Sequence, residues 1–132
     1  MNLVDRGGKW GRVARCGGQQ VQNVSHQGKT DISFTVNKTD LASTRKFVES
    51  ASRDLGAETV IANPDMAKVS IVGTGIQNHP GYAARMFGAM SEAGINIDMI
   101  STSEIRITVL IDHDRVSDAV RVLHKTFELD KA

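Results

Sequence analysis

A glycine- and proline-rich segment, residues 73–81, has the clearest potential for binding chemistry in this sequence. It follows the apolar run 69–72 and precedes apolar residues at helical spacing, so the order predicts a strand, a loop and a helix. Pro80 suits the first turn of that helix, where its missing N–H costs little. Backbone N–H groups at a helix start, together with the helix dipole, attract a carboxylate. The loop residues predicted to form this site are Gly75, Ile76, His79 and Gly81.

Polar residues elsewhere in the chain could hold the other groups of a free amino acid. Its ammonium needs carbonyl or carboxylate oxygens, which Asp98 and Glu104 could supply, although Glu104 also fits a simple exposed strand acid. A side-chain hydroxyl would need polar partners such as Gln22 or Asn96, whereas a side-chain ammonium would prefer one of the two carboxylates. The pattern favours binding of a small metabolite.

The sequence offers little that could catalyse a reaction. The glycine spacing fits neither the GxxxxGK[ST] phosphate loop nor the GxGxxG dinucleotide fingerprint. The hydroxyl residues 101–103 have no neighbouring histidine pattern. His26, His113 and His124 show no metal-ligand spacing, and His79 is more typical of a loop or cap. We therefore predict no catalytic residue, no metal and no cofactor.

Composition narrows the class of protein further. The chain has 132 residues and a formal net charge of +1, and aromatic residues make up 5%, which argues against nucleic-acid binding. No apolar run approaches the roughly 20 residues needed to cross a bilayer, so we expect no membrane partner. The start of the chain lacks an apolar signal-peptide core. The single Cys16 excludes an intrachain disulfide, which favours a reducing, cytoplasmic location.

The chain divides into three stretches. Residues 1–20 are rich in glycine and arginine with few apolar residues, which predicts irregular or disordered structure. Residues 21–66 contain an alternating strand at 32–36, a helix from about residue 41 that ends at Gly56, and a short β-branched strand at 59–62. Residues 67–132 contain the strand–loop–helix described above and three further elements. These are strands at 95–99 and 105–111 and a final helix at 116–127.

These elements indicate an internal duplication. The strand and helix that follow Thr30 match the strand and helix that follow Glu104 at nearly constant spacing. The second module is nearly complete, whereas residues 1–20 lack the pattern expected at the start of the first, which is therefore truncated. A partial module leaves open sheet edges and uncovered apolar faces. We therefore expect a homodimer or a higher oligomer.

Residues 21 to 130 resemble the C-terminal regulatory region of aspartate kinase. The resemblance is strongest to the threonine- and lysine-sensitive kind, whose regulatory region also exists as a separate small subunit (beta subunit). The segment Ser-Thr-Ser-Glu-Ile-Arg-Ile at 101–107 is its most specific motif. The other stretches that carry it are 69–81, 94–100 and 119–129, with 21–25 and 30–36 in the first module. The resemblance implies tandem ACT domains: an α+β, ferredoxin-like βαββαβ fold whose antiparallel sheet carries its helices on one face.

The resemblance also implies a function and a set of site residues. Such modules pair through their sheets and bind amino-acid effectors at the interface, which implies feedback control of aspartate-family and lysine biosynthesis. Asn96 and Ile97 match positions that contact threonine, and Gln22 matches their counterpart on the neighbouring module. Ser103 and Glu104 match positions near the lysine site. The upstream kinase domain, an ATP-dependent phosphotransferase, is absent here, so the chain is not expected to be an enzyme alone, and a catalytic subunit is a further expected partner.

Two other readings stay open at this point. A structural ACT subunit that oligomerises without binding an effector would fit the truncated first module. An RNA-binding ferredoxin-like module would fit the basic, glycine-rich residues 6–12, although the predicted strands lack the aromatic pairs that stack on bases.

Overall fold

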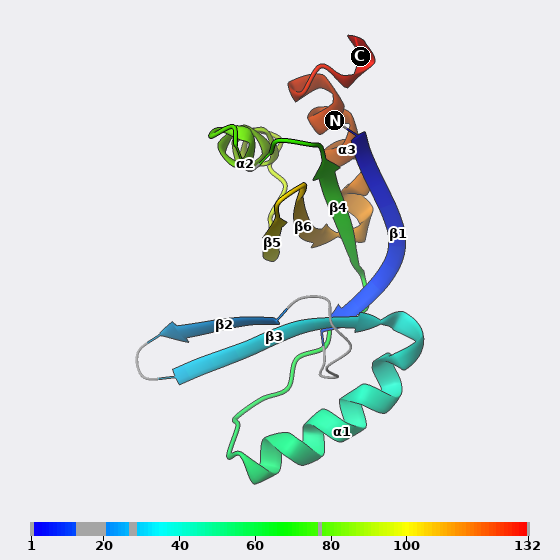
Figure 1. The fold of residues 1–132 in the computed structure, drawn as a ribbon. Coiled ribbons are helices and arrows are strands. Elements are labelled where there is room, and N and C mark those ends of the chain that lie inside the picture. The colour runs from blue at the N-terminus through cyan, green and yellow to red at the C-terminus, as the bar shows by residue number, and fades with distance from the viewer. Residues whose placement is uncertain (1, 13–20, 27–28, 77, 132) are drawn as a thin grey trace. The chain divides into compact units, whose positions relative to one another are not determined.

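The computed structural model describes residues 2–12, 21–26, 29–76 and 78–131 (Figure 1). The chain forms two compact units. The N-terminal unit is Gly8–Met66, and the C-terminal unit combines Ala67–Ala132 with Met1–Gly7. No helix in the described part of the chain is long and apolar enough to cross a membrane.

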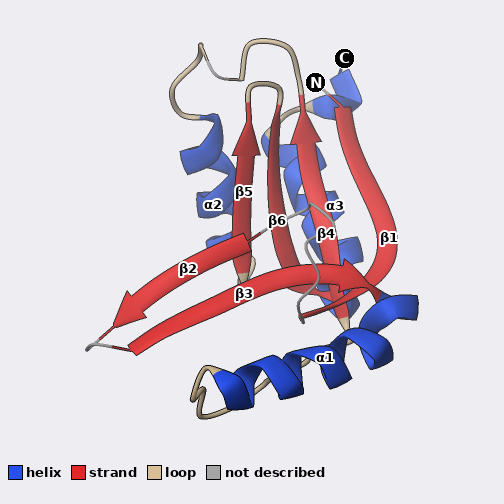
Figure 2. Ribbon diagram, turned by 60° about the horizontal axis from the view of Figure 1, so that its bottom comes forward, coloured by secondary structure: helices blue, strands red, loops and turns tan. Residues whose placement is uncertain are grey.

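The C-terminal unit is an antiparallel sheet with its helices on one face (Figure 2). Its strands follow the order β4 (Met66–Val72), β6 (Arg106–Asp112) and β5 (Met99–Ser103), and β1 (Asn2–Arg12) adjoins β4. Its elements are β4 (Met66–Val72), α2 (Tyr82–Glu92), β5 (Met99–Ser103), β6 (Arg106–Asp112), η2 (His113–Arg115), α3 (Val116–Thr126) and η3 (Leu129–Lys131). This α+β arrangement confirms the fold class predicted from the sequence.

The core of this unit follows from strand and helix periodicity. Alternate residues of β4 and β6 point toward the helices, as strand geometry requires. From the sheet they are Ala67, Val69, Ile71, Ile107, Val109 and Ile111, and from the helices Met86, Ala89, Met90, Val116, Ala119 and Leu123. Met86 and Met90 are fully buried, and their flexible side chains fill the space between the helices and the sheet.

The N-terminal unit pairs three strands and carries one long helix. The strand order is β2 (Val21–His26), β3 (Lys29–Asn37) and β1 (Asn2–Arg12). The short η1 (Lys38–Asp40) leads from β3 into α1 (Leu41–Asp54). Although Thr44 is buried on α1, Phe47 is 69% and Leu55 80% exposed, so this helix leaves apolar surface open.

The prediction of irregular structure for residues 1–20 is wrong for Asn2–Arg12, which form β1. Pairing with β3 places Trp10 opposite Asn37 and Arg12 opposite Thr35. Backbone N–H and C=O groups make these pairs, so a strand can form without the apolar alternation that sequence analysis relies on. Residues 13–20 lie outside the described part of the chain.

Glycine caps end α1 and α2, and the cap of α2 explains why one strand begins later than predicted. The N–H of Gly94 bonds the carbonyl of Ser91 (2.9 Å), and the N–H of Ile95 bonds that of Met90 (2.9 Å), a Schellman motif. Gly56 ends α1 in the same way. Ile95 therefore belongs to the helix cap, and the strand predicted at 95–99 starts only at Met99.

The strand predicted at 59–62 is wrong. These residues form a connection between α1 and β4, and they join no strand pairing within the described residues. Ile61 is 72% exposed, so its apolar side chain is not held against a sheet. β-branched residues favour strands only where a neighbouring strand and a packed face are available.

Candidate functional site

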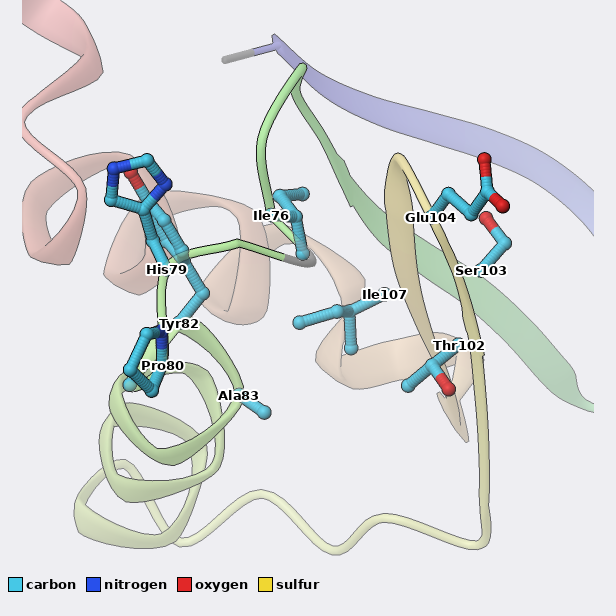
Figure 3. Close-up of a pocket in the computed structure, with 10 residues that line it drawn as sticks. Ile76, His79, Pro80, Tyr82, Ala83, Thr102, Ser103, Glu104 and Ile107 are labelled. Carbon is cyan, nitrogen blue, oxygen red and sulfur yellow. The ribbon is translucent and has the colours of Figure 1, made fainter.

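A pocket of about 440 Å³ lies in the C-terminal unit, between the start of α2 and the β5–β6 hairpin (Figure 3). One side consists of the loop and the first helical turn: Ile76, His79, Pro80, Gly81, Tyr82 and Ala83. The other side consists of Thr102, Ser103, Glu104 and Ile107. The predicted glycine–proline loop thus forms one wall of a concave site large enough for a small metabolite.

The start of α2 gives the pocket an anion-binding wall. Gly81 is the N-cap, with φ 112°, and as a glycine it has no side chain that could cap the helix. Its carbonyl accepts from the N–H of Arg85 at 2.9 Å, which sets the first turn. The first N–H groups of a helix have no acceptor within it, and those of Tyr82 and Ala83 belong to residues that line the pocket. A carboxylate is the ligand group that such a terminus favours.

Two contacts to the carbonyl oxygen of Gly75 hold the loop before α2 in a turn. The N–H of Asn78 bonds the carbonyl of Gly75 at 3.0 Å, and His79 Nδ1 lies 2.9 Å from the same oxygen. Gly75 has φ 90°, a conformation that favours glycine. The His79 ring stands edge-on to Tyr82, with centroids 6.2 Å apart. His79 therefore braces the loop as well as lining the pocket.

The middle of the pocket is apolar. Ile76 and Ile107 are almost fully buried, and both belong to the hydrophobic core cluster. Figure 3 shows them between α2 and the hairpin, with the Ala83 methyl on the helix side. An aliphatic portion of a ligand would replace water on this surface, which is favourable at about 25 cal/mol per Å² buried.

The hairpin supplies the polar side of the pocket. Cross-strand pairing sets Thr102 opposite Ile107 and Ser103 opposite Arg106. Because paired residues share a face of the sheet, Thr102 shares the helix-covered face with Ile107, and Ser103 shares the opposite face with Arg106. Glu104 lies in the turn and is exposed. Figure 3 shows Thr102 on the Ile107 side of the hairpin and the side chains of Ser103 and Glu104 directed away from Ile76 and α2, so the Glu104 carboxylate lies at the rim of the pocket.

Two cationic side chains, Lys68 on β4 and Arg106 on β6, lie close enough beside the hairpin to repel each other. Lys68 on β4 is half-buried, and burial followed by repulsion from Arg106 lowers the pKa of its ammonium group. Groups of three or more metal-ligating side chains do not occur among the described residues.

The structure brings together half of the predicted site residues. Ile76, His79, Gly81, Ser103 and Glu104 all line the pocket, and Gly75 forms the loop beneath His79.

The other predicted residues lie elsewhere. Asn96, Ile97 and Asp98 precede β5, roughly 16 Å of strand away from Ser103 at its far end. Asn96 Nδ2 donates to Asp98 Oδ1 at 2.9 Å, so these two polar side chains bind each other. Gln22 lies in β2 of the N-terminal unit. A role for these residues in effector binding stays a prediction.

Sequence reasoning missed five residues that line the pocket: Pro80, Tyr82, Ala83, Thr102 and Ile107. Tyr82 and Ala83 could have been found, since they are the first residues of the helix that the Pro80-Gly81 pair announces. To place Thr102 and Ile107 in the pocket from the sequence would have required knowing the register of the hairpin, which no short motif encodes.

Comparisons with known proteins identify the class. The family model for the ACT domain matches residues 69–127, which span β4 to the end of α3. A crystal structure of aspartokinase alpha and beta subunits is similar with a TM-score of 0.83 and 33% identity, over 97% of this chain and 98% of that one. The regulatory subunit of aspartate kinase from Thermus flavus is similar with a TM-score of 0.77 and 28% identity, over 96% and 95% of the two chains.

Curated sequences agree with the structural matches. Aspartate kinase from Pseudomonas fluorescens (strain SBW25) is 46% identical over 110 residues, which is 83% of this chain and 27% of that protein. Aspartokinase from Helicobacter pylori (strain ATCC 700392 / 26695) is 41% identical over 111 residues, again 27% of its length. The chain belongs to the aspartokinase family and corresponds to its ACT-domain regulatory region. It spans about a quarter of the length of these curated relatives.

Proposed function

We propose that this chain binds an amino-acid effector, threonine or lysine, and thereby regulates aspartate kinase activity by feedback. The observation that carries this proposal is the pocket itself: a helix N-terminus and an apolar middle line one hollow, and Glu104 brings a carboxylate to its rim. Binding an effector needs no catalytic group, so the proposal gives this chain a regulatory role and no enzymatic activity of its own. Family membership supports the link to aspartate kinase, and the single cysteine of the sequence supports the cytoplasm as the proposed location.

The geometry suggests how an amino acid would lie. Its carboxylate would accept hydrogen bonds from the N–H groups of Tyr82 and Ala83, and its aliphatic carbons would pack on Ile76 and Ile107. Glu104 would attract the ammonium group. For threonine the hydroxyl would meet Thr102 or Ser103, whereas for lysine the ε-ammonium would reach toward Glu104.

A second ACT module would explain the predicted residues that lie outside the pocket. Among the described strands β5 comes last in the sheet, and an edge strand can pair with a strand of another chain. If another module paired antiparallel along this edge, the start of its own β5, with Asn96 and Ile97, would lie beside the Ser103 end of the first. We propose that a homodimer or higher oligomer completes the site in this way, and that a catalytic aspartate kinase subunit is a further partner.

Regulation would then follow from a population shift. An effector that binds one arrangement of paired modules more tightly than another stabilises that arrangement by the difference in binding free energy. In a complete kinase the favoured arrangement would be the inhibited one.

A thermal-shift titration of the purified chain with threonine, lysine, both together, and methionine as the control tests the proposal. Ligand that binds only the folded state raises its stability by RT ln(1 + [L]/Kd), about 2.7 kcal/mol at 100 times Kd. Glu104→Gln keeps the shape of an exposed side chain and removes its charge. We expect a saturable shift with threonine or lysine that Glu104→Gln weakens, and most strongly for lysine. Absence of a shift with every amino acid would contradict the proposal.

One observation favours a structural role as the second candidate. The N-terminal unit exposes several large apolar side chains: Ile32, Phe47, Leu55 and Ile61. Where such side chains are contiguous on the surface, they form a patch that favours association with another protein. A structural subunit would sediment as an oligomer and would show no thermal shift with any amino acid, which separates the two candidates in the titration described above.

A further inference from the structure

A cluster of rings and one cation connects the start of α2 to the end of α3. The Tyr82 and Phe127 rings stack with centroids 5.9 Å apart and planes 26° apart. The guanidinium carbon of Arg85 lies 4.9 Å from the centroid of the Phe127 ring. Arg85 Nη2 also donates a hydrogen bond to the carbonyl oxygen of Thr126. Phe127, the residue that follows α3, is thus held by two side chains of α2.

The spacing along α2 explains how this arrangement forms. Tyr82 and Arg85 are three residues apart and therefore project from the same side of the helix. Phe127 is 8% exposed, so stacking fixes a buried ring and not a mobile surface one. The bond from Arg85 to Thr126 places a cation on the last carbonyls of α3, where the helix dipole favours positive charge.

The same cluster reaches the pocket. Tyr82 lines the pocket and its backbone N–H belongs to the first turn of α2. His79 stands edge-on to Tyr82 and lies within hydrogen-bond distance of the carbonyl of Gly75, at the base of the loop. A continuous series of contacts therefore runs from the binding loop through Tyr82 to the end of α3.

We propose that Phe127 and Arg85 are positioning residues for the pocket. They hold the Tyr82 ring, and with it the first turn of α2, in the orientation that presents its N–H groups to a ligand. The C-terminal end of α3 therefore sets the affinity of a pocket that it does not line. The effect on affinity rests on the proposed amino-acid site, whereas the effect on Tyr82 can be observed without any ligand.

Tyr82 is the only tyrosine in the sequence, which allows a direct measurement. Full-length chain labelled with 3-fluorotyrosine gives one ¹⁹F resonance, from the pocket wall. Phe127→Leu removes the stacked ring and Arg85→Gln removes the cation. Phe87→Leu is the matched control, because Phe87 lies on the same helix, packs partly buried against the core and is absent from the pocket lining. Thermal unfolding of all three variants separates a local effect from general loss of stability.

Without ligand, we expect Phe127→Leu and Arg85→Gln to move the resonance toward its position in unfolded chain. We also expect them to speed amide exchange in the first turn of α2 and not in β4. Phe87→Leu should change neither. With threonine or lysine added, Phe127→Leu should weaken binding about two- to tenfold, the range that one aromatic pair accounts for.

Three outcomes are informative. An unchanged ¹⁹F resonance in both variants would overturn the positioning role. Wild-type affinity in Phe127→Leu, despite a moved resonance, would overturn the control of affinity by α3. If the variants move the resonance but no amino acid binds the wild-type chain, the positioning of Tyr82 stands, and the control of affinity fails together with the proposed function.

Discussion

The conformation of Gly81 leads to a prediction with a built-in control on the same helix. Gly81 has φ 112° and ψ −17°, and a Cβ added there would meet nothing within 4 Å. The cost of Gly81→Ala is therefore backbone strain alone, about 1–3 kcal/mol for a non-glycine residue in such a region. Gly88 lies inside α2, also with open space around an added Cβ. There Gly88→Ala should stabilise by about 0.5–1 kcal/mol, because alanine loses less entropy in a helix.

Urea unfolding followed by far-ultraviolet circular dichroism measures both variants against the wild-type chain. The same substitution at two positions of one helix should change the free energy of unfolding in opposite directions, with a gap of about 1.5–4 kcal/mol between the variants. Gly81→Ala should also weaken any anion bound at the start of α2, since it would distort the N-cap. Equal or higher stability of Gly81→Ala relative to wild type would refute the reasoning, as would parallel losses in both variants.

Three further changes test packing, hydrogen bonding and charge. Leu123→Ala removes a fully buried side chain and should cost about 2–5 kcal/mol, whereas Leu55→Ala, at an 80% exposed position, should cost under about 0.5 kcal/mol in the same denaturation assay. Ser70 Oγ and Thr108 Oγ1 lie 2.7 Å apart, so Ser70→Ala should cost about 1–3 kcal/mol by leaving the buried Thr108 hydroxyl without its partner. Adding Thr108→Val to Ser70→Ala should cost less than the sum of the single changes in a double-mutant cycle. In the folded chain the pKa of Lys68 lies below its ordinary 10.5, so between the folded and unfolded pKa values the unfolded chain binds more protons than the folded chain. In this pH range the free energy of unfolding, measured relative to Lys68→Met, should therefore rise with pH. A difference that stays flat or falls with pH would contradict the lowered pKa.

Much of the C-terminal unit could be predicted from the sequence because its signals are local. Alternating apolar residues in β4 and β6 and the apolar stripe of α2 define the core, and each depends only on side-chain periodicity. The Pro80-Gly81 pair marks the start of α2, and Gly94 marks its end through the Schellman motif. The loop that these signals predict is the loop that lines the pocket.

The features that could not be predicted depend on pairing between distant segments. β1 forms from a glycine-rich sequence because backbone groups pair with β3, and nothing in its side chains announces that pairing. Thr102 and Ile107 meet in the pocket because of hairpin register, which places them opposite each other. Asn96 and Asp98 fit the chemistry of an amino-acid site, yet the strand between them and Ser103 separates them from the pocket. Residue type alone does not show which end of a strand a site occupies.

Amide chemical-shift mapping of isotope-labelled chain, during titration with threonine and with lysine, tests the central claim most directly. If the pocket binds an amino acid, the saturable shifts should cluster on residues 75–83 and 102–107, the loop, the start of α2 and the hairpin. Shifts at residues 96–98 as well would support completion of the site by a second module. Saturating amino acid that leaves the pocket amides unmoved, or that moves only the amides of α1, would contradict the account.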